Sequence, residues 1–351
     1  MKIAVLGAGF SGLAVAYHLT RYSTGRCKID LFDPEPIGQG PSATALGLLH
    51  PYMGRKAMRS WEANRCLTRA HELITVAAAA IQEPIVLSKG ILRPAYRPED
   101  ISLFQERASQ DQEHLEFWNQ ERGLKLVPGI ELPEECGLLY VKEGLTLNVP
   151  RYLQGLFRAC ISHGVVFKQL VGIPSKMIDQ YDAFAVCLGA NALGFGDFRN
   201  LPMTPIKGQV LRLSWPTTTP PLTMNLVGEK QIVMAPDNKS CWIGATYERS
   251  FSDFLPHKEQ AWEQLMPKIV DFFPLLAQSE ILECRAGFRA SPIHHLPLMG
   301  KHGKFWFLAG LGSRGLLYHA WLGRRLALCI TRDNASFIPK EVLHQLVPKP
   351  A

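Results

Sequence analysis

The sequence of 351 residues predicts a two-domain α/β protein, with one domain built on a parallel sheet and the other on an antiparallel sheet. A strand, a glycine-rich turn, a helix and a second strand follow one another in the first 33 residues, which is how a parallel sheet of this class begins. The apolar run in 182–191 suits a strand covered on both faces, whereas 207–213 and 241–246 alternate as antiparallel strands do. The first domain is therefore expected in three pieces, with the β-rich domain inserted twice: residues 1–85, 145–205 and 290–351 for the first, and residues 86–144 and 206–289 for the second.

The most informative motif lies at the start of the chain. An apolar strand over 2–6 leads into Gly7-Ala8-Gly9-Phe10-Ser11-Gly12, residues 13–19 have the composition of a helix, and a second strand over 29–32 ends in Asp33. In this context Gly7 allows a tight turn, Gly9 lets the backbone approach a pyrophosphate, and Gly12 lets the helix pack close to the strand. The helix N-terminus presents free N–H groups to phosphates, and Asp33 is expected to accept hydrogen bonds from a ribose. The motif predicts a Rossmann-like dinucleotide-binding domain.

The remaining elements follow from hydrophobic periodicity and from the positions of proline and glycine. Residues 34–41 are expected to form a loop, and the small residues of 42–47 allow close approach to a flat ligand. The further elements are expected in this order: helix 61–83, strand 86–93, helix 99–122, strand 138–141, helix 150–163, a strand in 182–191, strands 207–213, 232–234 and 241–246, helix 258–272, strand 305–309 and helix 316–331.

Composition narrows the functional class. No run of eighteen apolar residues occurs, so no transmembrane helix is expected, and the chain starts on a core strand without a secretory signal pattern, which predicts a cytoplasmic protein. The eight cysteines are scattered without a C-x-x-C pair and are expected to be reduced thiols, with no metal site. The formal net charge of +7 is typical of a solvated surface, but it also permits an anionic or polynucleotide substrate.

Taken together, a series of segments resembles the D-amino-acid oxidase superfamily of FAD enzymes, which includes glycine oxidase and sarcosine oxidase. The segments occur in the order of the family: Gly7–Gly12, Asp33, Ser42–Pro51, Asp182–Asn191, Pro205–Gln209, Gly244–Thr246, Gly287–Arg289, Leu296–Gly300 and Gly310–Gly315. The resemblance implies a Rossmann-like FAD-binding domain with an inserted antiparallel substrate domain. It also implies non-covalent FAD, because no cysteine or histidine falls at the attachment positions of the family.

Within the superfamily, the loop Gly310–Leu316 and the pair Arg289 and His295-Leu296-Pro297 are most similar to one branch. That branch is the FAD domain of the bifunctional enzyme that makes 5-methylaminomethyl-2-thiouridine at the tRNA wobble position. There the flavin removes a carboxymethyl group from a secondary amine and glyoxylate is released. The methyltransferase half is not found in this sequence, so the expectation is a stand-alone oxidase half. His294 departs from the family, which has an aspartate before the Leu-Pro motif.

The resemblance also implies the residues of the site. Arg289 is expected to clamp a substrate carboxylate, since a guanidinium fork matches two carboxylate oxygens; the alternative is a structural ion pair. Arg314 either adds charge near the reduced flavin or braces its loop. His50, Tyr52 and Tyr247 are candidates for facing the substrate, with core or loop packing as the alternative. The cofactor residues are expected to be Gly7, Gly9, Phe10, Ser11, Gly12, Asp33, Pro34, Thr44, Ala45, Leu46, Val171, Gly189, Gly310, Gly312, Ser313, Arg314, Gly315 and Leu316.

The expected reaction is hydride transfer from a substrate carbon to flavin N5, followed by hydrolysis of the imine to a 2-oxo acid and an amine. Three hypotheses remain open: an enzyme of tRNA wobble-uridine processing, an oxidase or dehydrogenase of free glycine, sarcosine, proline or D-amino acids, and a flavoprotein without amine chemistry. The expected partner is accordingly tRNA or a small amine. Trp242 stands where sarcosine oxidases have a lysine that assists oxygen, which predicts a slow reaction with oxygen.

Overall fold

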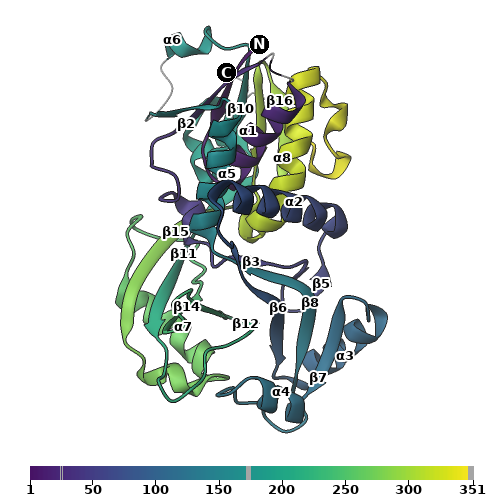
Figure 1. Ribbon diagram of the computed structural model, residues 1–351, viewed down its shortest axis with the longest axis vertical. Coiled ribbons are helices and arrows are strands. Elements are labelled where there is room, and N and C mark those ends of the chain that lie inside the picture. The colour runs from purple at the N-terminus through teal and green to yellow at the C-terminus, as the bar shows by residue number, and fades with distance from the viewer. Residues whose placement is uncertain (24, 26, 171–174, 347–351) are drawn as a thin grey trace.

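The computed structural model describes residues 1–351 except 24, 26, 171–174 and 347–351, and it contains two large sheets stacked end to end (Figure 1). The six-stranded sheet has the order β16-β17-β10-β1-β2-β9, and all its pairings are parallel except that of β16 with β17. Its strands are β1 (Lys2–Leu6), β2 (Lys28–Asp33), β9 (Val166–Gln169), β10 (Ala183–Val186), β16 (Leu298–His302) and β17 (Phe305–Ala309).

Both faces of this sheet are covered, as the continuous apolar strands predict. Side chains alternate across a strand, so Ile3 and Val5 pack against the helices while Ala4 and Leu6 pack on the opposite face, which 3-10 turns cover. The helices on the first face are α1 (Phe10–Tyr22), α2 (Ala63–Ile81), α5 (Val149–Ser162) and α8 (Gly315–Arg332) (Figure 1). The turns on the second face are η2 (Gly189–Gly194) and η3 (Gly196–Asn200).

The nine-stranded sheet has the order β15-β11-β14-β13-β12-β6-β8-β3, and β7 pairs with β8 beside this path. It is antiparallel as predicted, apart from the parallel pairing of β12 with β6. Its strands are β3 (Leu48–Leu49), β6 (Val86–Ala95), β7 (Leu115–Asn119), β8 (Gly137–Leu147), β11 (Met203–Ser214), β12 (Asn225–Val227), β13 (Gln231–Met234), β14 (Ser240–Gly244) and β15 (Ile281–Pro292).

One predicted helix, over 99–122, is wrong in its middle. The structure has α3 (Pro98–Gln110), then β7, then α4 (Gln120–Leu126). Strand β7 pairs with β8 and buries Leu115 and Trp118, and the indole of Trp118 lies 4.8 Å from the ring of Tyr140. Pairing with a distant strand therefore overrides the helical composition of this segment.

The other elements are short or lie at the edges of the sheets. Helix α7 (Lys258–Val270) packs against the nine-stranded sheet through Leu265 and Ile269. The remaining elements are β4 (Tyr52–Met53), β5 (Met58–Arg59), α6 (Ser175–Ile178), η1 (Pro41–Thr44), η4 (Pro274–Gln278), η5 (Gly312–Arg314), η6 (Ala335–Phe337) and η7 (Lys340–Val342). In the part of the chain that the structure describes, no helix combines the length and the apolar character needed to cross a membrane. The residue bounds of the two domains remain a prediction.

Candidate active site

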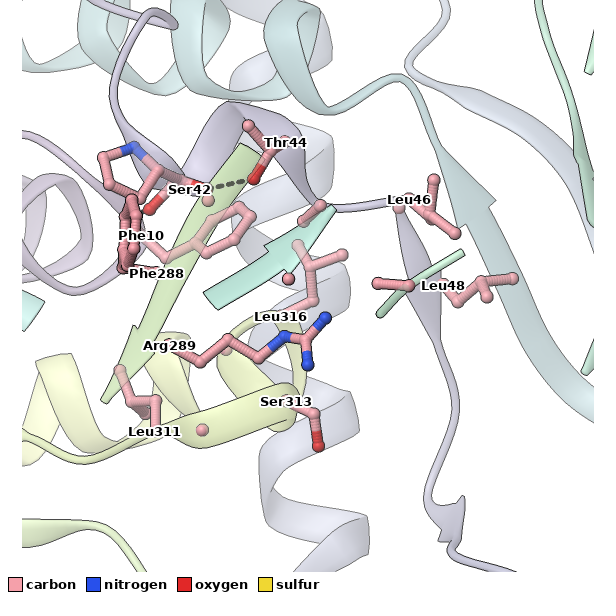
Figure 2. A pocket seen from close by; sticks show the side chains of 18 of the residues that line it. Phe10, Ser42, Thr44, Leu46, Leu48, Phe288, Arg289, Leu311, Ser313 and Leu316 are labelled. Atoms are coloured by element: carbon pink, nitrogen blue, oxygen red, sulfur yellow. Dashed lines mark hydrogen bonds between the residues drawn. The ribbon is translucent and has the colours of Figure 1, made fainter. Parts of the chain in front are cut away.

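A cavity of about 910 Å³ runs between the glycine-rich turn of the six-stranded sheet and the face of the nine-stranded sheet (Figure 2). Most residues that the sequence assigned to a cofactor or a substrate meet on its wall, although they come from segments far apart in the chain. These are Gly7, Gly9, Phe10, Ser11, Asp33, Pro34, Thr44, Ala45, Leu46, His50, Tyr52, Gly189, Tyr247, Arg289, Gly310, Gly312, Ser313, Gly315 and Leu316.

The turn between β1 and α1 has the close approaches that a phosphate-binding turn needs. Gly7 has a positive φ of 94°. A Cβ on Gly9 would lie 2.6 Å from Oγ of Ser42, so glycine at this position lets Ser42 lie against the turn, where its Oγ accepts from the Phe10 N–H at 3.4 Å. Helix α1 begins at Phe10 with no acidic side chain in its first turn. Its N-terminus is therefore available to an anion.

Asp33 ends β2 and fixes this turn. Its Oδ2 accepts a hydrogen bond from the Ala8 N–H at 2.6 Å, and its Oδ1 accepts one from the Glu35 N–H at 2.9 Å. A carboxylate oxygen has a second lone pair, so these bonds leave Asp33 able to accept from a ribose as well. The ribose contact remains a prediction.

Two of the predicted cofactor residues do not line the cavity, and a third cannot be placed. A Cβ on Gly12 would lie 1.7 Å from the carbonyl oxygen of Gly7, so Gly12 packs α1 against the turn, which is the role its motif predicts. The Arg314 guanidinium donates to the Tyr318 hydroxyl at 3.2 Å and to the His295 carbonyl at 3.5 Å, which favours the bracing alternative; its role stays a prediction. Val171 lies outside the described residues.

The second glycine-rich loop lies beside the first. Gly310 and Gly312 have positive φ values of 69° and 56°, and helix α8 begins at Gly315. A Cβ on Gly315 would lie 3.1 Å from the ring of Phe10, so the N-termini of α1 and α8 meet at this wall. His294, the departure from the family pattern, lies in an exposed turn.

Arg289, on β15, is the only predicted substrate residue with a free charge. Figure 2 shows its side chain extending from the strand into the cavity. Its guanidinium makes no hydrogen bond or ion pair with any residue that the structure describes. Burial lowers the pKa of this guanidinium, and the nearby Tyr247 phenol opposes that effect. A buried cation without an anion is costly, so the side chain is poised for an anionic ligand.

The other three substrate candidates differ from one another. His50 is 4% exposed, and burial with the charge of Arg93 lowers its pKa to about 3, so it is neutral. Tyr52 is 2% exposed and its hydroxyl donates to Asp111, which favours the core-packing alternative for this residue. Tyr247 is 50% exposed and lines the cavity.

Sequence reasoning missed several charged residues of the wall. Arg93 is 5% exposed near the end of β6, and it donates to the Tyr52 carbonyl at 2.6 Å. A charge inside an apolar strand was the signal that could have found it. Lys230 and Lys268 also line the cavity. Nothing local marks them, because Lys230 lies in a turn between two strands and Lys268 on the exposed side of a helix.

Comparison with known proteins agrees with this geometry. A family model described as "DAO: FAD dependent oxidoreductase" matches residues 2–328. The chain is 23% identical to the tRNA 5-methylaminomethyl-2-thiouridine biosynthesis bifunctional protein MnmC of Methylobacillus flagellatus, an alignment that covers 99% of the chain and 58% of that protein. The chain thus spans about half the length of such relatives.

Solved structures share the whole fold. Glycine oxidase from Geobacillus kaustophilus superposes with a TM-score of 0.81 at 18% identity and covers 99% of both chains. Iminodiacetate oxidase from Chelativorans sp. BNC1 superposes with a TM-score of 0.78 at 18% identity, over 97% of this chain and 98% of that one. At these identities the likeness concerns the fold.

Proposed function

Because the chain belongs to the DAO family of FAD dependent oxidoreductases, we propose that it oxidises the carbon–nitrogen bond of an N-substituted glycine or an amino acid. The family match confirms the predicted superfamily, the cofactor FAD and the class of enzyme, an FAD-dependent amine or amino-acid oxidoreductase. That class of enzyme speaks against the third hypothesis, a flavoprotein without amine chemistry. The identity of the substrate and the roles of the residues below are our proposal.

The residues of the cavity fit FAD. The turn Gly7–Gly12 and the α1 N-terminus would hold the pyrophosphate, Asp33 the ribose, and Thr44–Leu46 with Gly310–Leu316 the ring system. Bound FAD supplies the acceptor for the hydride of the substrate carbon. The N–H groups at the start of α8 favour negative charge on whatever lies against them.

The observation that carries the proposal is the unpaired Arg289 guanidinium. A planar fork of N–H donors binds a carboxylate through two parallel hydrogen bonds, which fixes position as well as orientation. Holding the carboxylate of the substrate in this way places the adjacent carbon and amine at a fixed distance from the cavity wall. That positioning is the main contribution that the protein can make when the cofactor supplies the chemistry.

For the specific substrate, we propose the carboxymethylaminomethyl group of a tRNA wobble uridine, whose oxidation releases glyoxylate. Two observations support this choice: the relatives named for tRNA modification align over 85–99% of the chain, and the calculated pI is about 9.0. The exposed Arg97 also lines the cavity and suits a polyanion, whereas Arg55 and Lys268 on the same wall are paired with acids. A tRNA substrate places this activity in the cytoplasm.

A free small substrate is the second candidate. The observation in its favour is that a glycine oxidase shares the fold of this chain over 99% of both chains, with a TM-score of 0.81. In this case the positive surface charge plays no part in recognition, and Arg289 would hold glycine, sarcosine, proline or a D-amino acid by its carboxylate.

The test is anaerobic bleaching of the flavin in the purified yellow protein. One series receives glycine, sarcosine, proline and D-amino acids, and the other receives unmodified tRNA and tRNA carrying the carboxymethylaminomethyl group. Bleaching by the modified tRNA alone, with glyoxylate released, supports the first candidate. Fast bleaching by a free amino acid supports the second, and no bleaching in either series contradicts the proposed reaction.

A further inference from the structure

Lys230 is a second cation on the cavity wall that no acid neutralises. It lies between β12 and β13, and its Nζ donates to the carbonyl oxygen of Ala245 at 2.9 Å. Burial lowers the pKa of this amine; Glu229 opposes the effect, and the charges of Arg289 and Lys268 add to it. Among the described residues no carboxylate lies within ion-pair distance of it. An ammonium has three donors, so two remain free.

The charged heads of Lys230 and Arg289 converge on two consecutive residues. The Lys230 ammonium donates to the carbonyl oxygen of Ala245. The Arg289 guanidinium lies over Gly208: a Cβ built on Gly208 would be 2.4 Å from Nη2 of Arg289. The same Cβ would be 3.3 Å from the carbonyl oxygen of Thr246. Gly208 is on β11, and β11 pairs with β14, whose end leads into Ala245. Gly208 thus lies on the strand next to the one that leads into Ala245, and both cations line the same cavity, close enough for the charge of Arg289 to act on the Lys230 amine.

Two adjacent cations repel each other more strongly in a partly buried site than in water. A single carboxylate on Arg289 neutralises only one of them. A methyl substituent on the substrate nitrogen leaves the Lys230 ammonium facing an apolar group, which adds the cost of desolvating an unpaired charge. A substrate with a negative group on each side of its nitrogen satisfies both cations.

We propose that Lys230 forms a second anion subsite beside Arg289, and that the substrate is an N-substituted glycine whose nitrogen substituent carries a second anionic oxygen group, a carboxylate or a phosphate. Arg289 holds the glycine carboxylate and Lys230 holds the second group. This inference rests on the proposed function, because it takes Arg289 as the anchor of the first carboxylate. It adds the chemical class of the substituent.

The test measures binding to the FAD-loaded protein by calorimetry, with ligands in which sulfur replaces the substrate nitrogen and which are therefore not amine substrates. Thiodiacetate carries two carboxylates and (methylthio)acetate carries one. In a second arm, uridine 5′-monophosphate and uridine each compete against (methylthio)acetate. A difference between these two competitors shows whether the second anionic group can be a phosphate. We expect the dianion, or the nucleotide, to bind at least about tenfold tighter than its partner, and Lys230→Met to abolish that preference.

Two controls keep the result specific. Lys230→Arg retains the charge and is expected to retain most of the preference, while Lys239→Met removes an exposed lysine and is expected to leave it unchanged. The subsite is overturned if the unaltered protein binds both members of each ligand pair equally well. It is also overturned if Lys230→Met still prefers the ligand with the additional negative charge. The calorimetry measures binding without turnover. The Lys230 subsite can therefore be confirmed even if no amine bleaches the flavin, so the subsite and the proposed reaction can fail independently.

Discussion

The guanidinium of Arg289 lies over Gly208 of the neighbouring strand β11, where a Cβ would come within 2.4 Å of Nη2. The atom in the way is the end of a flexible side chain, so a larger residue at 208 displaces the guanidinium without breaking the sheet. Gly208, which itself lines the cavity, thus helps to set the position of the proposed clamp.

We predict that Gly208→Ala raises the Kd of a carboxylate ligand by about 10–100-fold, because a displacement of about 1 Å at such a clamp costs roughly this factor. The melting temperature and the FAD content are expected to stay near their original values. Titration of the flavin spectrum with the ligand measures the Kd, and thermal unfolding measures the melting temperature. Gly194→Ala is the matched control, since nothing lies within 4 Å of the added atom there. An unchanged Kd in Gly208→Ala contradicts the geometry.

We predict that Arg289→Met lowers kcat/KM for carboxylated substrates by about 10²–10³-fold, because it removes one partner of a buried charge pair. FAD should be retained, since among the described residues no hydrogen bond or ion pair joins the Arg289 guanidinium to the turns that would hold the cofactor. Arg285→Met is the control: this arginine is on the same strand, pairs with Glu283 and covers Trp242. If Arg289→Met loses FAD or fails to fold, the residue has a structural role.

We predict that acid destabilises the protein through buried histidines. Burial lowers the pKa of His18 and of His50 to about 3, and that of His319 to about 4. The unfolded chain, with pKa values near 6.5, therefore binds more protons between pH 6.5 and about 3. Stability is complete above pH 6.5 and falls with pH below it, by up to about 1.4 kcal/mol per pH unit for each histidine.

Urea unfolding at pH 6.5, 5.5 and 4.5 measures this slope. His18→Gln is expected to reduce the slope by the share of one histidine, whereas His71→Asn, at an exposed position, is expected to leave it unchanged. This prediction is contradicted if the unfolding free energy of His18→Gln changes with pH as steeply as that of the unaltered protein.

We predict that oxygen reoxidises the reduced enzyme slowly, as the tryptophan at position 242 suggests. In the structure Trp242 lies outside the cavity lining, and the Arg285 guanidinium lies 4.5 Å from its ring, so this position offers no cation to the cavity. Stopped-flow mixing of the reduced enzyme with air-saturated buffer measures the rate. Reoxidation as fast as in typical flavin oxidases contradicts the prediction, and a fast reaction with an artificial acceptor such as a quinone agrees with it.

Local motifs could be predicted well because they are self-contained. The roles of Gly7 and Gly12 follow from a turn of six residues between a strand and a helix, and the structure has both close approaches. Asp33 lies where its spacing places it, at the end of β2. In these cases, neighbours in sequence determine the geometry.

The rest depends on pairings between distant segments. The residues of β7 have the composition of a helix, and they form a strand because they pair with the distant strand β8. Lys230 reaches the cavity because β13 pairs with β14, and Arg93 because β6 crosses behind residues 52–54. Nothing next to Lys230 in the sequence marks the pairing that brings it to the cavity, whereas the charge of Arg93 within an apolar strand is a local signal.

The meeting of α1 and α8 at one wall has a consequence for biosynthesis. Gly9 and Leu316 line the same cavity, yet 306 positions separate them in the chain. At about 5–20 residues per second, a ribosome delivers Leu316 about 15–60 s after Gly9. Until then the second glycine-rich loop and helix α8 are missing, so only one side of the FAD site exists. The cofactor can therefore enter a complete site only late in translation, once β17 and the N-terminus of α8 have been made.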